Sequence, residues 1–174
     1  MPIHMTMGDT FQTAFLPADF DAALNRWIEL GAGPFFVMRN RVFTRSVFRG
    51  QLVGTAIDVA LGQWGDVQIE LIRQLDDGPS GYREWLDAGG RGVHHLGVQV
   101  PDLQRARHRV RDAGYEIVQE ITSGEMDLFY AASPDRDQPI VECMAPPPSM
   151  FERFEMMKAA RRAWDGVTDP VRAM

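Results

Sequence analysis

The sequence has little cysteine and no long hydrophobic run. Cys143 is the only cysteine among 174 residues, which excludes an intrachain disulfide and fits a reducing compartment. No apolar stretch approaches the ~18 residues that a membrane-spanning helix needs, and residues 1–10 lack the apolar segment of a signal peptide. We therefore expect a soluble, cytoplasmic protein that does not enter a membrane.

The sequence also lacks an excess of positive charge. Its formal net charge is −6 at pH 7, whereas a nucleic-acid-binding surface is normally basic, so no nucleic-acid partner is expected. The rest of the composition is ordinary, because 45% of the residues are hydrophobic, as in a typical globular domain. A length of 174 residues predicts one domain, or two small modules that share a core.

The most informative feature that is present is an internal repeat. Residues 12–23 align with residues 95–106, and a repeat of this kind indicates the architecture of a chain. Three aligned pairs lie 83 positions apart: Gln12 and His95, Asp19 and Asp102, and Gly31 and Gly114. Farther along, Glu70 corresponds to Glu142. Each half thus begins with a polar side chain on its first predicted strand and ends with a glutamate on its last.

Both halves follow the same predicted order of strand, helix and three further strands. Alternation and short apolar runs predict the strands, while Asp19 and Asp102 are suited to cap the helices. In the first half we expect strands at 11–16, 35–38, 52–61 and 66–73 and a helix at 22–30. In the second half we expect strands at 94–100, 115–122, 126–131 and 139–144 and a helix at 103–113.

These patterns divide the chain into four predicted parts. They are a first module at 9–79, a linker with a short helix at 80–91, a second module at 92–146 and a helical extension at 147–174. In the extension an apolar stripe recurs at helical spacing: Phe151, Phe154, Met157 and Trp164. We expect this stripe to pack against the modules or against a partner subunit, which would make the protein a homodimer.

Two glutamates lie in apolar strands, where a carboxylate needs a partner. Because side chains alternate along a strand, Glu70 and Glu142 would face the concave side while their apolar neighbours face helices. Taken singly, such a glutamate more often forms a salt bridge, and a histidine in an apolar strand is more often a core residue. The symmetric placement instead predicts one divalent metal per chain, bound by Gln12, Glu70, His95 and Glu142. Their oxygens and single imidazole suit Zn, Ni, Co, Mn or Fe(II).

Two neighbouring features are open at the level of the sequence. Strand alternation places His94 on the face opposite to His95, in the core or behind the predicted site. Five aromatic residues fit either an aromatic substrate pocket or the core: Phe35, Phe36, Trp64, Phe129 and Tyr130.

The paired modules, with the segment HLGVQVPD at 95–102 opening the second, resemble the vicinal oxygen chelate superfamily. That superfamily includes glyoxalase I, methylmalonyl-CoA epimerase, extradiol dioxygenases and bleomycin-resistance proteins. The resemblance implies an α+β fold in which two βαβββ modules form one eight-stranded incomplete barrel around a metal site. The ligands that it implies lie on the first and last strand of each module, and they are similar to those of glyoxalase I: Gln12, Glu70, His95 and Glu142.

The resemblance also implies a function, namely metal-dependent isomerisation, epimerisation or lyase chemistry on a small carbonyl compound. The metal would polarise a carbonyl or enolate oxygen, and Glu142 or Glu70 would move the proton. Two alternatives stay open. A ring-cleaving extradiol dioxygenase uses Fe(II) with two histidines and one carboxylate, a pattern from which Gln12 departs. A non-catalytic binding protein of the bleomycin-resistance type lacks the metal ligands that are all present here.

Overall fold

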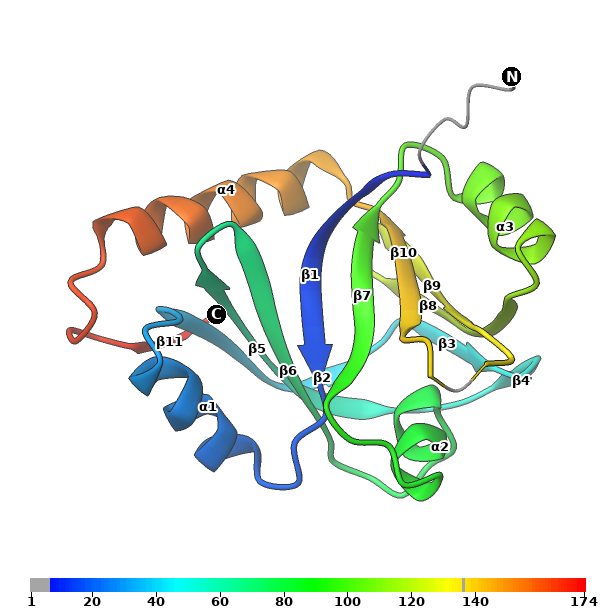
Figure 1. Cartoon of the computed structure of the whole chain (residues 1–174), viewed down its shortest axis with the longest axis horizontal. Helices are drawn as coiled ribbons and strands as arrows, with labels where there is room; N and C mark the ends of the chain where they lie inside the picture. Colours follow the sequence, from blue (N-terminus) through cyan, green and yellow to red (C-terminus); the bar gives the residue numbers. More distant parts are fainter. Residues whose placement is uncertain (1–6, 136) are drawn as a thin grey trace.

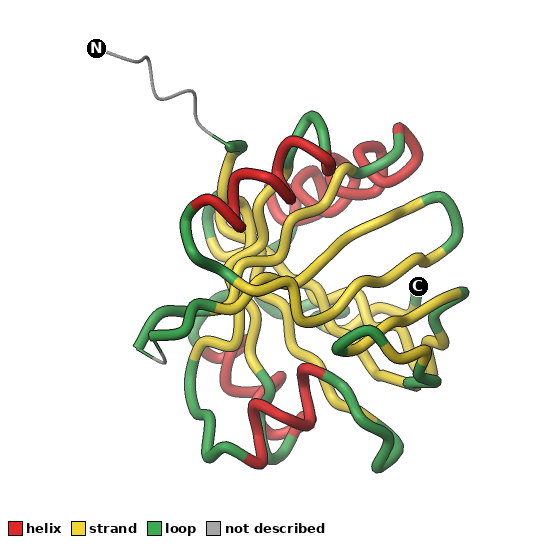
Figure 2. The backbone as a smooth tube through the Cα atoms, turned by 90° about the vertical axis from the view of Figure 1, so that its right-hand side faces the viewer, coloured by secondary structure: helices red, strands yellow, loops and turns green. Residues whose placement is uncertain are grey.

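The computed structural model describes residues 7–135 and 137–174, which form one large sheet with four α-helices (Figure 1). The strands run through the middle of the molecule and the helices lie at its periphery (Figure 2). Eleven strands follow one another across the sheet: β11 (Val171–Ala173), β2 (Phe35–Val42), β5 (Ala56–Trp64), β6 (Val67–Gln74), β1 (Asp9–Phe15), β7 (Val93–Gln99), β10 (Ile140–Ala145), β9 (Met126–Ala132), β8 (Glu116–Ser123), β3 (Arg45–Phe48) and β4 (Gln51–Leu52). The helices are α1 (Phe20–Glu29), α2 (Gly81–Asp87), α3 (Leu103–Asp112) and α4 (Pro148–Ala163).

Two copies of a βαβββ unit form the centre of this sheet, which confirms the predicted α+β fold. The first module consists of β1, α1, β2, β5 and β6, and the second of β7, α3, β8, β9 and β10. The modules join where β1 pairs antiparallel with β7 in the middle of the sheet (Figure 1). The sheet stays open, as expected for an incomplete barrel of eight module strands.

The pairing register shows that the repeat holds residue by residue. Thr13 lies opposite Leu96 at the centre of the β1–β7 ladder, and these two residues are themselves 83 positions apart. The flanking pairs exchange in the same way: Gln12 with Gly97, and Ala14 with His95. The ladder therefore maps onto itself when the modules are exchanged, with a pseudo-twofold axis through its central pair.

An aspartate starts each module helix, as the sequence predicts. The carboxylate of Asp19 accepts from the backbone N–H of Ala22, and that of Asp102 accepts from Gln104 and Arg105. Each helix covers the outer face of its own module, because α1 packs on β6 and α3 packs on β8 and β10. The outer faces form two small apolar cores, while the concave face forms a third core that both modules share.

Two short strands between β2 and β5 were not predicted. The expected strand at 52–61 is interrupted, because β4 ends at Leu52 and β5 begins only at Ala56. Arg49 and Gly50 both adopt positive φ at the β3–β4 turn, the geometry of a tight hairpin. β3 then pairs antiparallel with β8, so a strand from the first module extends the sheet of the second.

The C-terminal segment covers part of the concave face. α4 packs there through the buried side chains of Phe154 and Met157, so the predicted stripe lies partly against the modules, while Phe151 remains 46% exposed. Beyond α4 the chain forms β11, an unpredicted strand that pairs in parallel with β2 and covers that edge of the sheet. No helix in the described ranges is long and apolar enough to cross a membrane.

Candidate metal centre

The four predicted ligands come from four neighbouring strands at the centre of the sheet. In spatial order these are β6 with Glu70, β1 with Gln12, β7 with His95 and β10 with Glu142. Nε2 of His95 lies 3.2 Å from Oε2 of Glu70 and 3.5 Å from Oε2 of Glu142. The ligand atoms of these three residues all lie within 4.8 Å of one another. A single cation can bridge that spacing, since metal–ligand bonds are about 2 Å long.

Gln12 is held beside this group by its own amide. Its Nε2 donates a 2.8 Å hydrogen bond to Oε1 of Gln68 on β6, which fixes the orientation of the amide and leaves its oxygen free. Gly97, opposite Gln12 on β7, provides the room for that oxygen, because a Cβ at Gly97 would lie 2.6 Å from it. The amide is thus oriented by one neighbouring strand and accommodated by the other.

Each predicted ligand carries a buried atom without a hydrogen-bond partner among the described residues: Oε1 of Gln12, Oε2 of Glu70, Nε2 of His95 and Oε2 of Glu142. Buried polar atoms are rarely left unpaired, because each costs about 1–3 kcal/mol. Here the four atoms belong to side chains on adjacent strands, and Nε2 of His95 lies at ion-pair distance from the two carboxylates. Three oxygens, one imidazole nitrogen and two negative charges form a donor set that fits Zn, Ni, Co, Mn or Fe(II).

The three ionisable side chains are electrostatically coupled. Burial raises the pKa of Glu70, and Glu142 adds to this effect while His95 opposes it. Burial alone would lower the pKa of His95, but the carboxylates of Glu142 and Glu70 raise it to about 9. At neutral pH an imidazolium can therefore balance part of the carboxylate charge in the metal-free protein. A cation must displace that proton, since only neutral imidazole coordinates a metal.

His94 lies on the same side of β7 as His95, which differs from the expectation of strand alternation. The register shifts here, so that Phe15 opposes Val93 and Ala14 opposes His95, and His94 is left as a β-bulge. Nδ1 of His94 comes 2.9 Å from Nδ1 of His95, so one ring donates a hydrogen bond to the other. Burial and the neighbouring His95 lower the pKa of His94 well below its ordinary value, which keeps this ring neutral.

The first module has the same bulge with a different residue. One position before Gln12 the register shift leaves out Phe11, whose counterpart 83 positions later is His94. Phe11 packs against Phe154 of α4, with ring centroids 5.4 Å apart. His94 instead packs against the rings of Tyr82, Trp85 and Tyr130. The second module therefore contributes both His95, which belongs to the cluster, and His94, which contacts His95 from behind.

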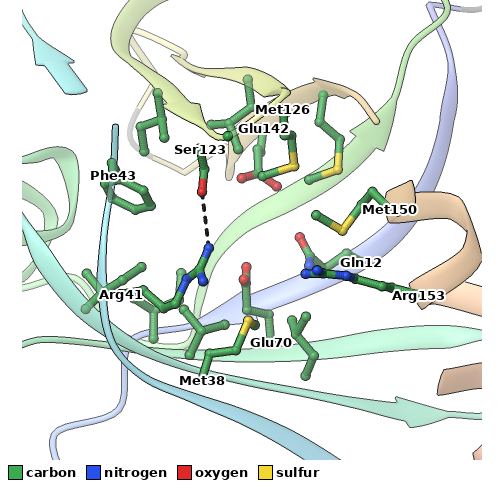
Figure 3. Close-up of a pocket in the computed structure, with 18 of the residues that line it drawn as sticks. Gln12, Met38, Arg41, Phe43, Glu70, Ser123, Met126, Glu142, Met150 and Arg153 are labelled. Carbon is green, nitrogen blue, oxygen red and sulfur yellow. Dashed lines mark hydrogen bonds between the residues drawn. The ribbon is translucent and has the colours of Figure 1, made fainter. Parts of the chain in front are cut away.

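A cavity of about 310 Å³ lies beside the cluster and is lined by Gln12, Glu70 and Glu142 (Figure 3). Strands of both modules and α4 form its wall, which is rich in methionine: Met38, Met126, Met144, Met150, Met157 and Met174. A mostly apolar cavity of this size, with a few convergent polar groups at one end, suits a small organic molecule.

Of the five aromatic residues considered for a pocket, Tyr130 alone lines this cavity. Phe35 and Phe129 belong to the outer cores beneath the module helices. Phe36 lies in the shared core and Trp64 packs against Trp27.

Two cavity-lining arginines were missed in the sequence, Arg41 and Arg153. The first lies on a part of β2 that the apolar pattern of 35–38 does not include, because the strand continues to Val42 through polar residues. The second lies on α4, whose position over the cavity depends on tertiary packing that periodicity does not specify.

Comparisons with known proteins agree with this architecture. The family described as Glyoxalase/Bleomycin resistance protein/Dioxygenase superfamily matches residues 11–132. Among solved structures, a hypothetical protein from Bacillus halodurans is 12% identical with a TM-score of 0.57, covering 82% of this chain and 96% of that one. Methylmalonyl-CoA epimerase from Mycobacterium tuberculosis is 20% identical with a TM-score of 0.54, covering 86% and 97%.

A further structure, a Streptomyces coelicolor methylmalonyl-CoA epimerase variant in complex with 2-nitronate-propionyl-CoA, is 19% identical with a TM-score of 0.52. The match covers 82% of this chain and 97% of that one. At these identities the structural likeness establishes a shared fold. No curated protein sequence matches the chain.

Proposed function

Because the chain belongs to the glyoxalase, bleomycin-resistance protein and dioxygenase superfamily, we propose that it is a metal-dependent enzyme acting on a small carbonyl compound. The proposed reaction is an isomerisation, epimerisation or elimination that passes through an enolate. One divalent cation per chain would be held by Gln12, Glu70, His95 and Glu142. When bound, this cation supplies a Lewis acid for a carbonyl or enolate oxygen.

The observation that carries this proposal is the convergence of ligand atoms of Glu70, His95 and Glu142 within 4.8 Å of one another. The free amide oxygen of Gln12 lies on the neighbouring strand. In the metal-free protein Nε2 of His95 lies at ion-pair distance from the two carboxylates, while the oxygen of Gln12 has no partner among the described residues. The cavity beside them gives a substrate access to the cluster. The epimerase neighbours act on coenzyme A esters by their names, and a thioester carbonyl is accordingly a substrate class to test here.

We assign proton transfer to Glu70 rather than to Glu142. Both line the cavity, but the Glu70 side chain is 13% exposed and the Glu142 side chain 4%, so Glu70 is the more accessible to a substrate. Burial raises the pKa of Glu70, which brings it closer to the working pH that suits a general base.

Deuterium exchange tests the proposal. The protein would be reconstituted separately with Zn, Co, Ni and Mn in D2O and incubated with 2-oxo- and 2-hydroxyacyl thioesters and with 2-oxoaldehyde adducts. We expect deuterium at the carbon next to the carbonyl, detected by NMR, without consumption of oxygen. Glu70→Gln should abolish the exchange while retaining a metal, because the amide keeps one ligand oxygen but cannot accept the proton.

Glu29→Gln is the control, because Glu29 is exposed at the end of α1 and is not part of the cluster. It should leave the exchange unchanged. If both variants bind metal, and exchange persists in Glu70→Gln but is lost in Glu142→Gln, then Glu142 is the general base. Absence of exchange with every metal and substrate would contradict the proposed chemistry.

The two alternatives predict other outcomes. An extradiol dioxygenase would consume oxygen with a catechol and Fe(II), and it needs two histidine ligands. Within the described residues one histidine joins the cluster, because His94 directs its Nδ1 to His95 instead. A binding protein without catalysis would bind ligands independently of metal and exchange no protons.

A further inference from the structure

We propose that Arg41 and Arg153 form a binding site for an anionic group, so that the substrate carries a carboxylate or phosphate at the end remote from its carbonyl. This inference rests on the proposed function in one respect, because it takes the four-residue cluster as the site of the carbonyl. The two arginines lie in different parts of the chain, on β2 and on α4, and in the folded molecule they line the same cavity.

Both arginines lie where the cavity opens to solvent. Each lines the cavity and each is also exposed, which places them at its mouth. Figure 3 shows the two side chains extending toward each other from opposite sides of the cavity, with Glu70 between them and Glu142 above. Nη2 of Arg41 donates a 3.4 Å hydrogen bond to Oγ of Ser123 on β8, which restrains its guanidinium at this position.

The charges of these two arginines are not neutralised by the protein. Five other arginines form ion pairs with carboxylates: Arg39, Arg49, Arg73, Arg83 and Arg107. Within the part of the chain that the structure describes, Arg41 and Arg153 have no carboxylate partner. Glu125 contributes one negative charge to the same wall, so the mouth keeps an excess of positive charge. A cationic mouth in a chain of net charge −6 indicates an anionic ligand.

The wall between the two ends defines the rest of the ligand. Apolar side chains such as Phe43, Met126 and Met150 make up much of the rest of the same cavity wall. A fitting compound therefore has a carbonyl at one end, an apolar body and an anion at the other end. Guanidinium groups bind both carboxylates and phosphates through paired hydrogen bonds, so both sources of the anion are compatible with this mouth.

Calorimetry with matched probes tests the inference on the full chain. The probes are 4-phenylbutyrate, its uncharged amide 4-phenylbutyramide and 4-phenylbutyl phosphate. Each would be titrated into the Zn-loaded and the chelator-treated protein. We expect the anions to bind at least about tenfold more tightly than the amide, as charge-assisted hydrogen bonds predict. The better of the two anions then identifies carboxylate or phosphate as the natural group.

Arg41→Gln and Arg153→Gln should each weaken anion binding by about tenfold, and the double variant should remove the preference over the amide. Amide binding should stay unchanged in all three variants, which separates loss of charge from loss of fold. Arg111→Gln, an exposed substitution at the end of α3, is the control for net charge and should have no effect.

Three outcomes would overturn the inference. Anion binding that disappears with chelator and ignores both arginine variants would place the anion on the metal. If the arginine variants lost affinity equally for the anions and for the amide, the arginines would have a structural role. If no probe bound to the wild type, the proposed anion site would not exist. Arginine-dependent anion binding without deuterium exchange would instead contradict the proposed chemistry and leave the anion site intact.

Discussion

At the scale of single residues, the main feature is a proton on His95 that the proposed cation would have to displace. The pKa of His95 is raised to about 9 by Glu142 and Glu70, and burial raises that of Glu70. Below pH 9 the metal-free protein therefore carries a proton on His95, which a metal must displace. Metal affinity should rise with pH until about 9 and level off above it.

Calorimetric titration of Zn at pH 7 in buffers of different ionisation enthalpy measures this release directly. We expect at least one proton per metal at pH 7 and a smaller number at pH 10. A heat of binding that is independent of the buffer at pH 7 would contradict the raised pKa of His95.

A second prediction at this scale concerns His94, which contacts His95 through its Nδ1. If Nε2 of His95 binds the cation, its Nδ1–H must donate to His94, so His94 fixes the tautomer and the orientation of the ring. His94→Phe copies the Phe11 of the other module and should keep the fold. It should nevertheless weaken metal affinity about 10–100-fold, as the loss of such a partner typically does.

The visible spectrum of the Co(II) protein provides the measurement, together with competition against a chelator. His94→Asn retains a hydrogen-bond acceptor and should recover part of the metal affinity. If His94 had only a structural role, the metal affinity of His94→Asn would be lower than that of His94→Phe. Equal affinities in the wild type and in His94→Phe would show that the contact has no function in metal binding.

At the scale of elements, α4 combines a buried face with an exposed one. Phe154 is 5% exposed and touches Phe11, while Phe151 is 46% exposed on the same helix. Phe154→Ala should lower the free energy of unfolding by about 3–5 kcal/mol, because it opens a void in the shared core. Phe151→Ala is the matched control and should change it by less than about 0.5 kcal/mol. Urea unfolding of the metal-loaded protein measures both, and similar losses would mean that α4 is not packed as described.

The helices and strands that could be predicted from the sequence are those determined by interactions between residues close together in the chain. Asp19 and Asp102 cap helices through their own side chains, and alternation identifies the strands that carry Glu70 and Glu142. The internal repeat then predicted that the four candidate ligands lie close together, because equivalent positions in two paired modules lie near the strands at which the modules join.

The elements that the sequence did not predict depend on distant partners. β3 is stabilised by pairing with β8, and β11 by pairing with β2, and neither short segment has a strong pattern of its own. The bulge at His94 arises from a register shift between β1 and β7, which no single strand encodes. For the same reason the arginines at the mouth of the cavity were not identified before the fold was known.

At the scale of the whole molecule, the metal would tie the two modules together, since each contributes two of the four candidate ligands. Removing the metal should therefore lower stability throughout the fold. At neutral pH we expect chelator to reduce the melting temperature by about 5–10 °C relative to protein with free metal near 100 times its Kd. Calorimetric melting curves of the two forms provide the test, and identical curves would contradict a buried metal site.

A variant sharpens this experiment. In the metal-free protein, Glu142→Gln should recover part of the lost stability, because it removes one of two neighbouring buried carboxylates. Glu125→Gln changes the net charge by the same amount at an exposed position and should recover nothing. The homodimer stays a prediction at this scale, for which sedimentation equilibrium is the appropriate measurement.

The seam between β1 and β7 also determines when the four candidate ligands can come together during folding. β1 lies between β6 and β7, so it has no partner in the sheet until those later strands are available. Strand pairs between residues far apart in the sequence form slowly, because the entropy of closing a long loop is lost before the favourable contacts form. Glu142 emerges last of the four candidate ligands, near the end of the second module. All four candidate ligands therefore come together only once the second module has paired with the first, so the proposed cation would bind late in folding.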